Sequence, residues 1–427
     1  MAPKTRVIID TDVGECGDDI IAILVALAAP AEDVEILLLS VVWGNVNVDK
    51  GLRNIITVFY IAQLEMQWRE AQGIPVGFQS LCAYKPIVAV GSPNALGEKT
   101  VLKTDGFHGP DGVGNFHTSH AHMSPPGPWR SLFQQGVPVP ENSPSWYKYF
   151  TPSHLPAHKE ILRVLKSEPA GTVTVCSIGP MTNIALAAAE DPEVFLRTKE
   201  LLVMGGAVDV PGNITPLAEA NTWNDALACA RVFALTSADP ASTMPLQTTP
   251  EIPVAPYPEK LSSKLLLKLF PLDITLGHYV DYTRFAKAIK PQIEAGSPLA
   301  VFVDTILGGI FRKVCSQYGG NASPKLALHD GLTIWYALSP RDPSWEWAAL
   351  DIRVETTGQW THGMHVTDRR GKVRADGVNE TEIAGDHLGW LSSTRGNRIN
   401  VVARDPLPEA YHYLILEQLF AGQEASI

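Results

Sequence analysis

Four aspartates stand within ten residues near the N-terminus, at Asp10, Asp12, Asp18 and Asp19. Like charges at this density repel one another and raise each other's pKa unless a cation balances them. Capping of a helix N-terminus, the structural alternative, needs only one such carboxylate. Oxygen donors on a tight, glycine-containing turn favour a hard cation such as Ca²⁺ or Mg²⁺. The acidic turn is therefore expected to hold a metal ion.

The segments on either side of this turn indicate where it lies. Arg6–Ile9 is a β-branched run that predicts a buried strand, Ile20–Ala29 predicts an apolar helix, and Val34–Trp43 predicts a second buried strand. This order is typical of a parallel βαβ unit. In such sheets ligands collect at the carboxyl ends of the strands, and the acidic turn follows the first strand directly.

The alternation of strands and helices resumes later in the chain. Strands are predicted at Thr172–Ser177 and Leu201–Met204, and helices at Met181–Glu190, Trp223–Leu235 and Leu299–Tyr318. The predicted fold class is α/β, with an open, Rossmann-like, mostly parallel sheet and helices on both faces. The active site is expected at the carboxyl ends of the strands.

Two proline-rich stretches interrupt the pattern, at about residues 98–156 and 238–262. The first is expected to run over the surface, because loops of this length in a compact domain tend to be lids or interface arms. No internal repeat divides the chain. Residues 1–427 are predicted to form a single domain that carries these two insertions.

The composition excludes several classes of protein. Hydrophobic residues make up 45% and charged residues 19%, as in ordinary soluble globular proteins. The apolar runs are shorter than the ~20 residues that cross a membrane. A net charge of −11 without basic runs argues against a nucleic-acid or anionic-membrane partner. Five scattered cysteines and the lack of a secretory signal predict a cytoplasmic protein with reduced thiols.

A strand that ends in Asp-x-Asp is also typical of haloacid-dehalogenase-type phosphatases. In that interpretation Asp10 would be the covalent nucleophile and Asp12 the acid/base. The pair Asp18-Asp19 follows too soon in the chain to be the separate acidic pair that such enzymes use.

Further motifs follow the acidic turn in a fixed order. They are Trp43-Gly44-Asn45, Gly179-Pro180-Met181-Thr182-Asn183, Met204-Gly205-Gly206, Gly212-Asn213, Glu219-Ala220-Asn221 and His329-Asp330. This ordered set, from about Asp10 to Asp330, resembles the inosine–uridine-type nucleoside hydrolases, which are Ca²⁺-dependent N-ribohydrolases. The resemblance implies a salvage enzyme that hydrolyses small-molecule ribonucleosides to ribose and free base. It also implies a homodimer or homotetramer.

The resemblance assigns roles to individual positions. The implied Ca²⁺ ligands are Asp10, Asp12, Asp19, the backbone carbonyl of Ile178, and Asp330. Asp12 would take the proton of the attacking water, and His329 would protonate the leaving base. The implied substrate contacts are Asp18, Asn45, Met204, Asn213, Glu219, Asn221 and His108. Carboxylates around the sugar suit the oxocarbenium-like transition state of such a cleavage.

The chain departs from the family's pattern within the acidic turn. Val13 stands where the family has proline, and the turn from Gly14 to Asp18 is two residues longer. If the extra residues bulge outward, Asp18 and Asp19 match the family's acidic pair; otherwise Glu15 could replace one of them. A second interpretation therefore keeps the scaffold but makes the protein a Ca²⁺-dependent ribose-binding protein that has lost catalysis.

Overall fold

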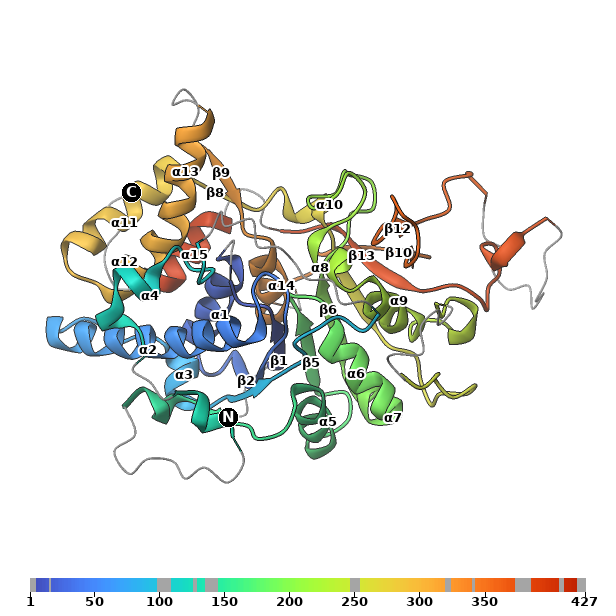
Figure 1. The fold of residues 1–427 in the computed structure, drawn as a ribbon, viewed down its shortest axis with the longest axis horizontal. Coiled ribbons are helices and arrows are strands. Elements are labelled where there is room, and N and C mark those ends of the chain that lie inside the picture. Colours follow the sequence, from blue (N-terminus) through green and yellow to red (C-terminus); the bar gives the residue numbers. More distant parts are fainter. Residues whose placement is uncertain are drawn as a thin grey trace.

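A nine-stranded sheet forms the centre of the molecule (Figure 1). The computed structural model describes residues 5–14, 17–97, 109–125, 129–134, 145–245, 254–318, 324–339, 342–372, 385–406 and 411–420. The strand order is β10-β13-β7-β6-β5-β1-β2-β3-β4, and each neighbouring pair in it is parallel except β10 with β13. The strands are β1 (Thr5–Thr11), β2 (Val34–Val41), β3 (Ile87–Val90), β4 (Thr151–Pro152), β5 (Val173–Ser177), β6 (Glu200–Met204), β7 (Leu267–Phe270), β10 (Glu346–Leu350) and β13 (Ile399–Arg404).

The chain changes direction across the sheet between β1 and β5. From β1 it builds outward through β2 and β3 to β4, and it then returns to the other side of β1 with β5, β6 and β7. In open α/β sheets a ligand crevice forms outside the carboxyl ends of the strands at this switch point. The acidic turn leaves β1 at that position.

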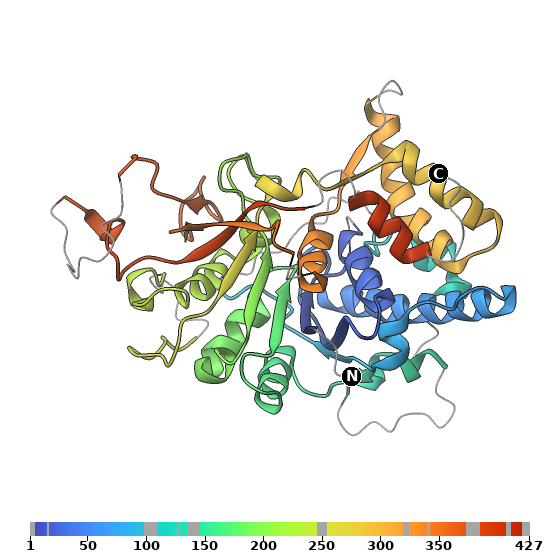
Figure 2. The same cartoon turned by 180° about the vertical axis from the view of Figure 1, so that it is seen from behind.

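Side chains of β1 alternate between two apolar cores. Val7 and Ile9 belong to one core and Ile8 to the other, as the two-residue repeat of a strand requires. The first core contains side chains of α1 (Asp18–Ala28), α2 (Val48–Gln72), α14 (His329–Leu338) and α15 (Tyr411–Phe420). The second contains side chains of α5 (Ala157–Ser167), α6 (Thr182–Glu190) and α9 (Ala226–Ala234). Helices therefore cover both faces of the sheet, which confirms the predicted α/β class (Figures 1 and 2).

The shorter elements lie between these layers and around them. They are α3 (Gln79–Ala83), α4 (Phe116–Ser119), α7 (Pro192–Phe195), α8 (Ala220–Asn224), α10 (Leu272–Thr275), α11 (Tyr282–Glu294), α12 (Pro298–Val303), α13 (Gly309–Tyr318), and the pairs β8 (Tyr279–Asp281) with β9 (Lys325–Ala327) and β11 (Arg353–Val354) with β12 (His365–Val366). A π-helical turn, Asp304–Gly308, joins α12 to α13, so the predicted helix Leu299–Tyr318 is one continuous run.

Parts of the described first proline-rich stretch are built into the core. Phe116 and Phe150 are fully buried; the ring of Phe116 packs edge-on against Phe302, and that of Phe150 stacks on Phe59. Strand β4, within the same stretch, pairs with β3. The prediction of an excursion over the surface is therefore wrong for these segments, because their aromatic side chains contribute to the core.

The predicted helix Trp223–Leu235 is two helices, α8 and α9. The break falls at Asp225, whose φ of −143° is not helical and whose carboxylate caps α9 by accepting the N–H of Ala228. The same carboxylate accepts the N–H of Leu96 and the hydroxyl of Thr182. These partners hold Asp225 in place, and the helix is interrupted there.

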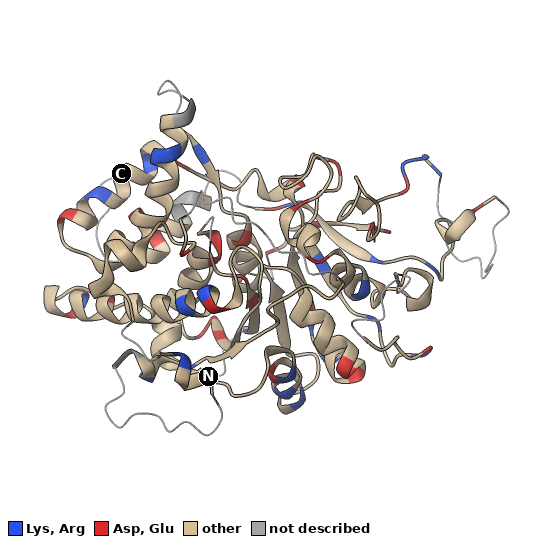
Figure 3. Ribbon diagram, in the orientation of Figure 1, with Lys and Arg blue, Asp and Glu red and all other residues tan. Residues whose placement is uncertain are grey.

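Acidic segments lie near the centre of the molecule, at the beginnings of α1 and α14 (Figure 3). Within the described parts of the chain, no helix combines the length and the apolar composition that a membrane crossing needs.

Candidate active site

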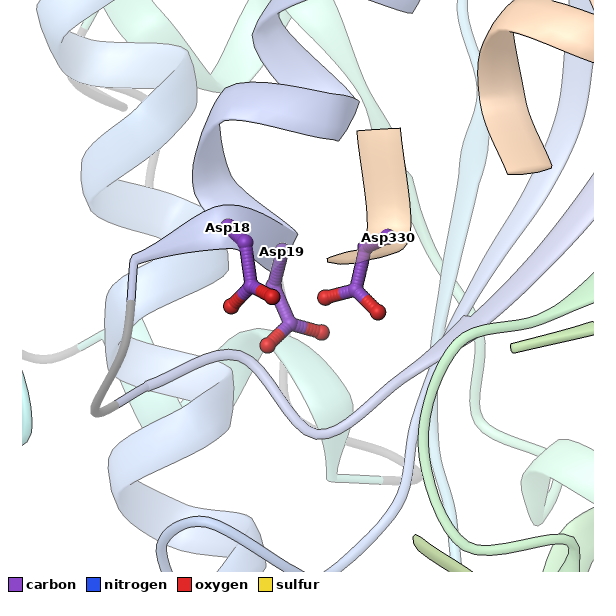
Figure 4. Close-up of side chains that lie close together, drawn as sticks. All are labelled: Asp18, Asp19 and Asp330. Carbon is purple, nitrogen blue, oxygen red and sulfur yellow. The ribbon is translucent and has the colours of Figure 1, made fainter. Parts of the chain in front are cut away.

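Two helix N-termini bring three carboxylates together beside β1 (Figure 4). Asp18 and Asp19 lie in the first turn of α1, and Asp330 lies in the first turn of α14. One oxygen from each carboxylate lies within 4.8 Å of the others, and all three side chains are buried. Each helix N-terminus supplies only about half a positive charge. Two of them leave most of the charge of three carboxylates uncompensated, so the group is suited to a bound cation.

Burial and mutual repulsion both raise the pKa of these carboxyl groups. Burial is the largest cause at Asp19 and at Asp330, and the charge of Asp18 adds to it at both. Burial also raises the pKa of Asp18, against the opposing effect of His329. Such groups ionise together only when positive charge is brought to them.

Asp12 adds a fourth carboxylate at the end of β1. Burial, followed by the charge of Asp19, raises the pKa of Asp12 well above its ordinary value. Its Oδ2 accepts the backbone N–H of Asn45 at 2.7 Å. Its Oδ1 is buried and has no hydrogen-bond partner among the described residues. A buried acceptor without a partner is costly in free energy, so this oxygen is available to a ligand.

Two glycines leave the space that the Asp12 carboxylate occupies. A Cβ atom at Gly44 would lie 2.0 Å from Oδ2 of Asp12, and a Cβ atom at Gly179 would lie 2.7 Å from Oδ1. Both glycines belong to motifs at strand ends. Any side chain at either position would push Asp12 out of its place.

Asp10 lies in a different environment from the three clustered carboxylates. Its Oδ1 accepts hydrogen bonds from Ser40 and Asn183, and its Oδ2 is buried without a partner in the described structure. Burial raises the pKa of Asp10 to about 7. Asp10 is not a member of the group formed by Asp18, Asp19 and Asp330.

Asn45 and Thr11 fix the orientation of Asp19. The hydroxyl of Thr11 donates to Oδ1 of Asp19, and the side-chain amide of Asn45 donates to Oδ2 at 3.3 Å. Asn45 thus contacts Asp12 with its backbone and Asp19 with its side chain.

The ends of β5 and β6 supply the opposite side of the site. The side-chain amide of Asn221 lies 3.4 Å from the carbonyl oxygen of Ile178 and 3.3 Å from that of Met204. Glu219 is buried, and its two oxygens accept three backbone N–H groups, those of Gly206, Asn221 and Thr222.

Asn213 binds the first residue of α8, for which Glu219 is the N-cap, and has no contact with the carbonyls of Ile178 and Met204 among the described hydrogen bonds. Its Oδ1 accepts the N–H of Ala220 at 2.9 Å. The oxygen therefore helps to hold the loop that ends at Glu219.

His329 opens α14 next to the carboxylate group. Its Nδ1 lies 2.7 Å from the hydroxyl oxygen of Thr275. Burial lowers the pKa of His329, whereas the charge of Asp18 raises it. An imidazole in this position can exchange a proton with a group bound beside the carboxylates.

Two predicted positions cannot be placed. His108 and Glu15 lie outside the described residues. Of the lengthened acidic turn, the structure describes Asp18 and Asp19. Both face Asp330 (Figure 4).

Oxygen atoms make up the donor set of this site. Among the residues that the structure describes, no cysteine or histidine is grouped with these carboxylates. Oxygen donors suit hard cations such as Ca²⁺ and Mg²⁺, whereas softer metals favour sulfur and imidazole. The orphaned Oδ1 of Asp12 adds an acceptor of the same kind.

Comparison with known proteins identifies the family. The family model described as inosine-uridine preferring nucleoside hydrolase matches residues 7–402. The chain belongs to this family. The resemblance found in the motifs is confirmed, and so is the prediction of an enzyme that hydrolyses N-glycosidic bonds of ribonucleosides.

Individual relatives agree with this assignment. The chain is 31% identical to a probable uridine nucleosidase of Arabidopsis thaliana over 67% of this chain and 73% of that protein. It is 27% identical to a pyrimidine-specific ribonucleoside hydrolase of Salmonella paratyphi C over 85% of this chain and 88% of that one. A solved plant nucleoside hydrolase has the same fold, with a TM-score of 0.63, 22% identity, and coverage of 98% of this chain and 100% of that one.

Several residues around the site were not singled out from the sequence. Thr11 and Ser40 bind carboxylates from within strands, and His365 binds the hydroxyl of Thr222 beside Glu219. The sequence does contain a signal for Ser40, because this polar residue follows an apolar run within β2. No local pattern points to His365, because its partner Thr222 lies far away in the sequence.

Proposed function

We propose that this nucleoside hydrolase uses Ca²⁺ to cleave ribonucleosides into ribose and free base. The observation that carries the proposal is the convergence of the buried carboxylates of Asp18, Asp19 and Asp330. The proposed ligands are the side chains of Asp12, Asp19 and Asp330 and the carbonyl of Ile178, with Asp10 as a further carboxylate behind them. A bound Ca²⁺ would supply electrostatic activation of a water molecule.

Asp12 is proposed to accept the proton of the attacking water. Calcium lowers the pKa of water only modestly, so a carboxylate base is still needed. The unpartnered Oδ1 of Asp12 supports this role, because it is an acceptor that no described residue occupies.

The ribose is proposed to bind between the carboxylates and the ends of β5 and β6. The proposed contacts are Asp18, Asn45, Met204, Asn213, Glu219 and Asn221. The hydrogen bonds of Glu219 hold the loop after β6 in place. A carboxylate has about four acceptor sites, and three of those of Glu219 are filled by backbone N–H groups. A sugar hydroxyl would use the acceptor capacity that these hydrogen bonds leave.

His329 is proposed to donate a proton to the leaving base, with His108 as a further base contact. The position of His329, next to Asp18 at the edge of the carboxylate group, supports this assignment. The base would then leave as a neutral molecule.

The remaining proposals concern the whole protein. We propose a cytoplasmic homodimer or homotetramer in which residues 1–427 form one domain with two insertions. Light scattering of the purified protein measures its mass, and a single cooperative unfolding transition is expected for one domain.

A product assay tests the proposed function. Purified protein with Ca²⁺ should release ribose from inosine, uridine or both, and no phosphate from p-nitrophenyl phosphate. Phosphate release would instead support Asp10 as a covalent nucleophile. Tight nucleoside binding without ribose release would identify a calcium-dependent binding protein.

A further inference from the structure

A buried hydroxyl, that of Thr275, contacts the imidazole of His329. Thr275 ends α10, which follows β7, and its side chain is fully buried. Its Oγ1 lies 2.7 Å from Nδ1 of His329. We propose that Thr275 is a positioning residue that orients His329 and presents its Nε2 to the leaving base. This inference rests on the proposed role of His329.

The direction of the hydrogen bond follows from the partners that are available. A buried hydroxyl needs an acceptor for its proton. Among the described residues, the structure gives the Thr275 hydroxyl no other hydrogen-bond partner than Nδ1 of His329. Thr275 therefore donates, and a neutral imidazole then carries its own proton on Nε2. To protonate a leaving base, the ring must first become an imidazolium, in which Nδ1 also carries a proton. The Thr275 hydroxyl, which can accept as well as donate, then accepts the Nδ1–H, and the proton on Nε2 is the one given to the base.

The backbone around this pair is held on both sides. The N–H of Leu328 donates to the carbonyl of His278 at 2.9 Å, and the hydroxyl of Tyr411 donates to the carbonyl of Leu328 at 2.9 Å. These bonds lie directly before His329 and shortly after Thr275. The two segments therefore cannot shift apart without breaking buried hydrogen bonds.

The His278 side chain secures the same turn. Its Nδ1 lies 3.0 Å from the carbonyl of Ile274, and its Nε2 lies 2.9 Å from a carboxylate oxygen of Asp405. Both His278 and Asp405 are buried. Thr275 is thus fixed in place by its neighbours. The hydrogen bond from its hydroxyl therefore restrains the rotation of the His329 ring.

Two substitutions at position 275 separate the hydroxyl from the shape of the side chain. Thr275→Val keeps the branched shape and removes the hydroxyl, whereas Thr275→Ser keeps the hydroxyl. We expect Thr275→Val to lower kcat on inosine or uridine about tenfold, the value of roughly one hydrogen bond. KM should change less than twofold, and Thr275→Ser should retain most of kcat.

The matched control lies on the same helix as His329. Thr333 in α14 is fully buried, and its hydroxyl has no partner in the described structure. Thr333→Val should leave kcat and KM unchanged. A loss of kcat in Thr333→Val equal to that in Thr275→Val would overturn the inference, because any buried threonine would then matter.

A substrate that needs no protonated leaving group tests whether Thr275 acts through His329. Hydrolysis of p-nitrophenyl riboside should be almost unaffected by Thr275→Val. In a His329→Ala background, Thr275→Val should cause no further loss on inosine. The inference would be overturned if Thr275→Val lowered kcat equally on both substrates. It would also be overturned if the effects of Thr275→Val and His329→Ala on kcat were additive in the double variant.

The same experiments distinguish this inference from the proposed function. If His329→Ala lowers kcat on inosine and on p-nitrophenyl riboside by the same factor, His329 is not the acid. The proposed role of His329 is then wrong. If His329→Ala is selective but Thr275→Val behaves as wild type, only the role of Thr275 fails. Should Thr275→Val not fold, ¹⁵N chemical shifts of His329 in the wild-type protein, assigned with His329→Ala, give the answer. A proton found on Nδ1 in the neutral ring contradicts the inference.

Discussion

Asp19 and Asp330 lie next to each other, with carboxylate oxygens within 4.8 Å, although they open helices from opposite parts of the chain. Helices α1 and α14 also pack against each other in the same core. Both carboxyl groups are buried, so their repulsion opposes the packing of the two helices whenever both are ionised. An ion bound between them would therefore stabilise the fold as well as serve the reaction.

Removal of calcium should lower both activity and melting temperature. A chelator leaves the carboxylates uncompensated, and added Ca²⁺ should restore both properties. At a free concentration of 100 Kd, the ion would add about 2.7 kcal/mol to the free energy of unfolding. Thermal denaturation with chelator, and then with excess Ca²⁺, measures the effect.

Asp330→Asn should reduce this dependence on calcium. The variant loses a ligand charge and a source of repulsion, so its melting temperature should differ little between chelator and Ca²⁺. Asp209→Asn is the matched control, because Asp209 is an exposed partner of Arg369. If Ca²⁺ raised the melting temperature of Asp330→Asn as much as that of wild type, Asp330 would not be a metal ligand.

Asp12→Asn should abolish turnover of every nucleoside. The substitution keeps the shape and the acceptor for the Asn45 N–H, but it removes the proposed base and a charged ligand. We expect kcat to fall by about three orders of magnitude or more, on inosine and on p-nitrophenyl riboside alike. A loss on inosine alone would instead assign Asp12 to activation of the leaving group.

The position of the acidic turn could be predicted because its signals are local. The run before Asp10 predicts a strand and the run after Asp19 predicts a helix, and parallel strands place their carboxyl ends at one edge. The approach of Asp330 could not be derived from these patterns. It was implied only by the resemblance, since the packing of α14 on α1 involves residues far apart in sequence.

The longest helix, α2, was not predicted although the sequence contains its caps. Asn47 caps its start by accepting the N–H of Lys50, and Gly73 ends it in the left-handed conformation. The buried side of α2 includes polar residues, among them Glu65 and Arg69, which pair with each other at 2.8 Å. Buried polar residues interrupt the apolar repeat by which a helix is recognised.

Gly44→Ala should damage the site, whereas Gly309→Ala should not. A Cβ atom at Gly44 would lie 2.0 Å from Oδ2 of Asp12, so the carboxylate must move. A Cβ atom at Gly309 meets nothing within 4 Å, and alanine favours the helix there by up to about 1 kcal/mol. We expect a large fall in kcat for Gly44→Ala and an equal or higher melting temperature for Gly309→Ala. Wild-type kcat in Gly44→Ala would show that the position of Asp12 is not critical.

His365 should make the protein less stable in mild acid. It is fully buried beside Thr222, and burial lowers its pKa to about 4. In the unfolded chain its pKa is about 6.5, so the unfolded state binds the proton first. The stabilising contribution of neutral His365 is complete above pH 6.5 and is lost as the pH falls toward 4, by up to about 3 kcal/mol.

Comparison with His365→Gln isolates this contribution, because other buried groups titrate in both proteins. The free energy of unfolding, or the melting temperature if unfolding is irreversible, is measured between pH 4 and pH 7. We expect the variant to be less stable than wild type at pH 7 and the difference to shrink as the pH falls. His154→Gln, at an exposed position, should follow the wild-type curve. A constant difference across this range would mean that the pKa of His365 is the same in the folded and unfolded states, so that burial does not lower it.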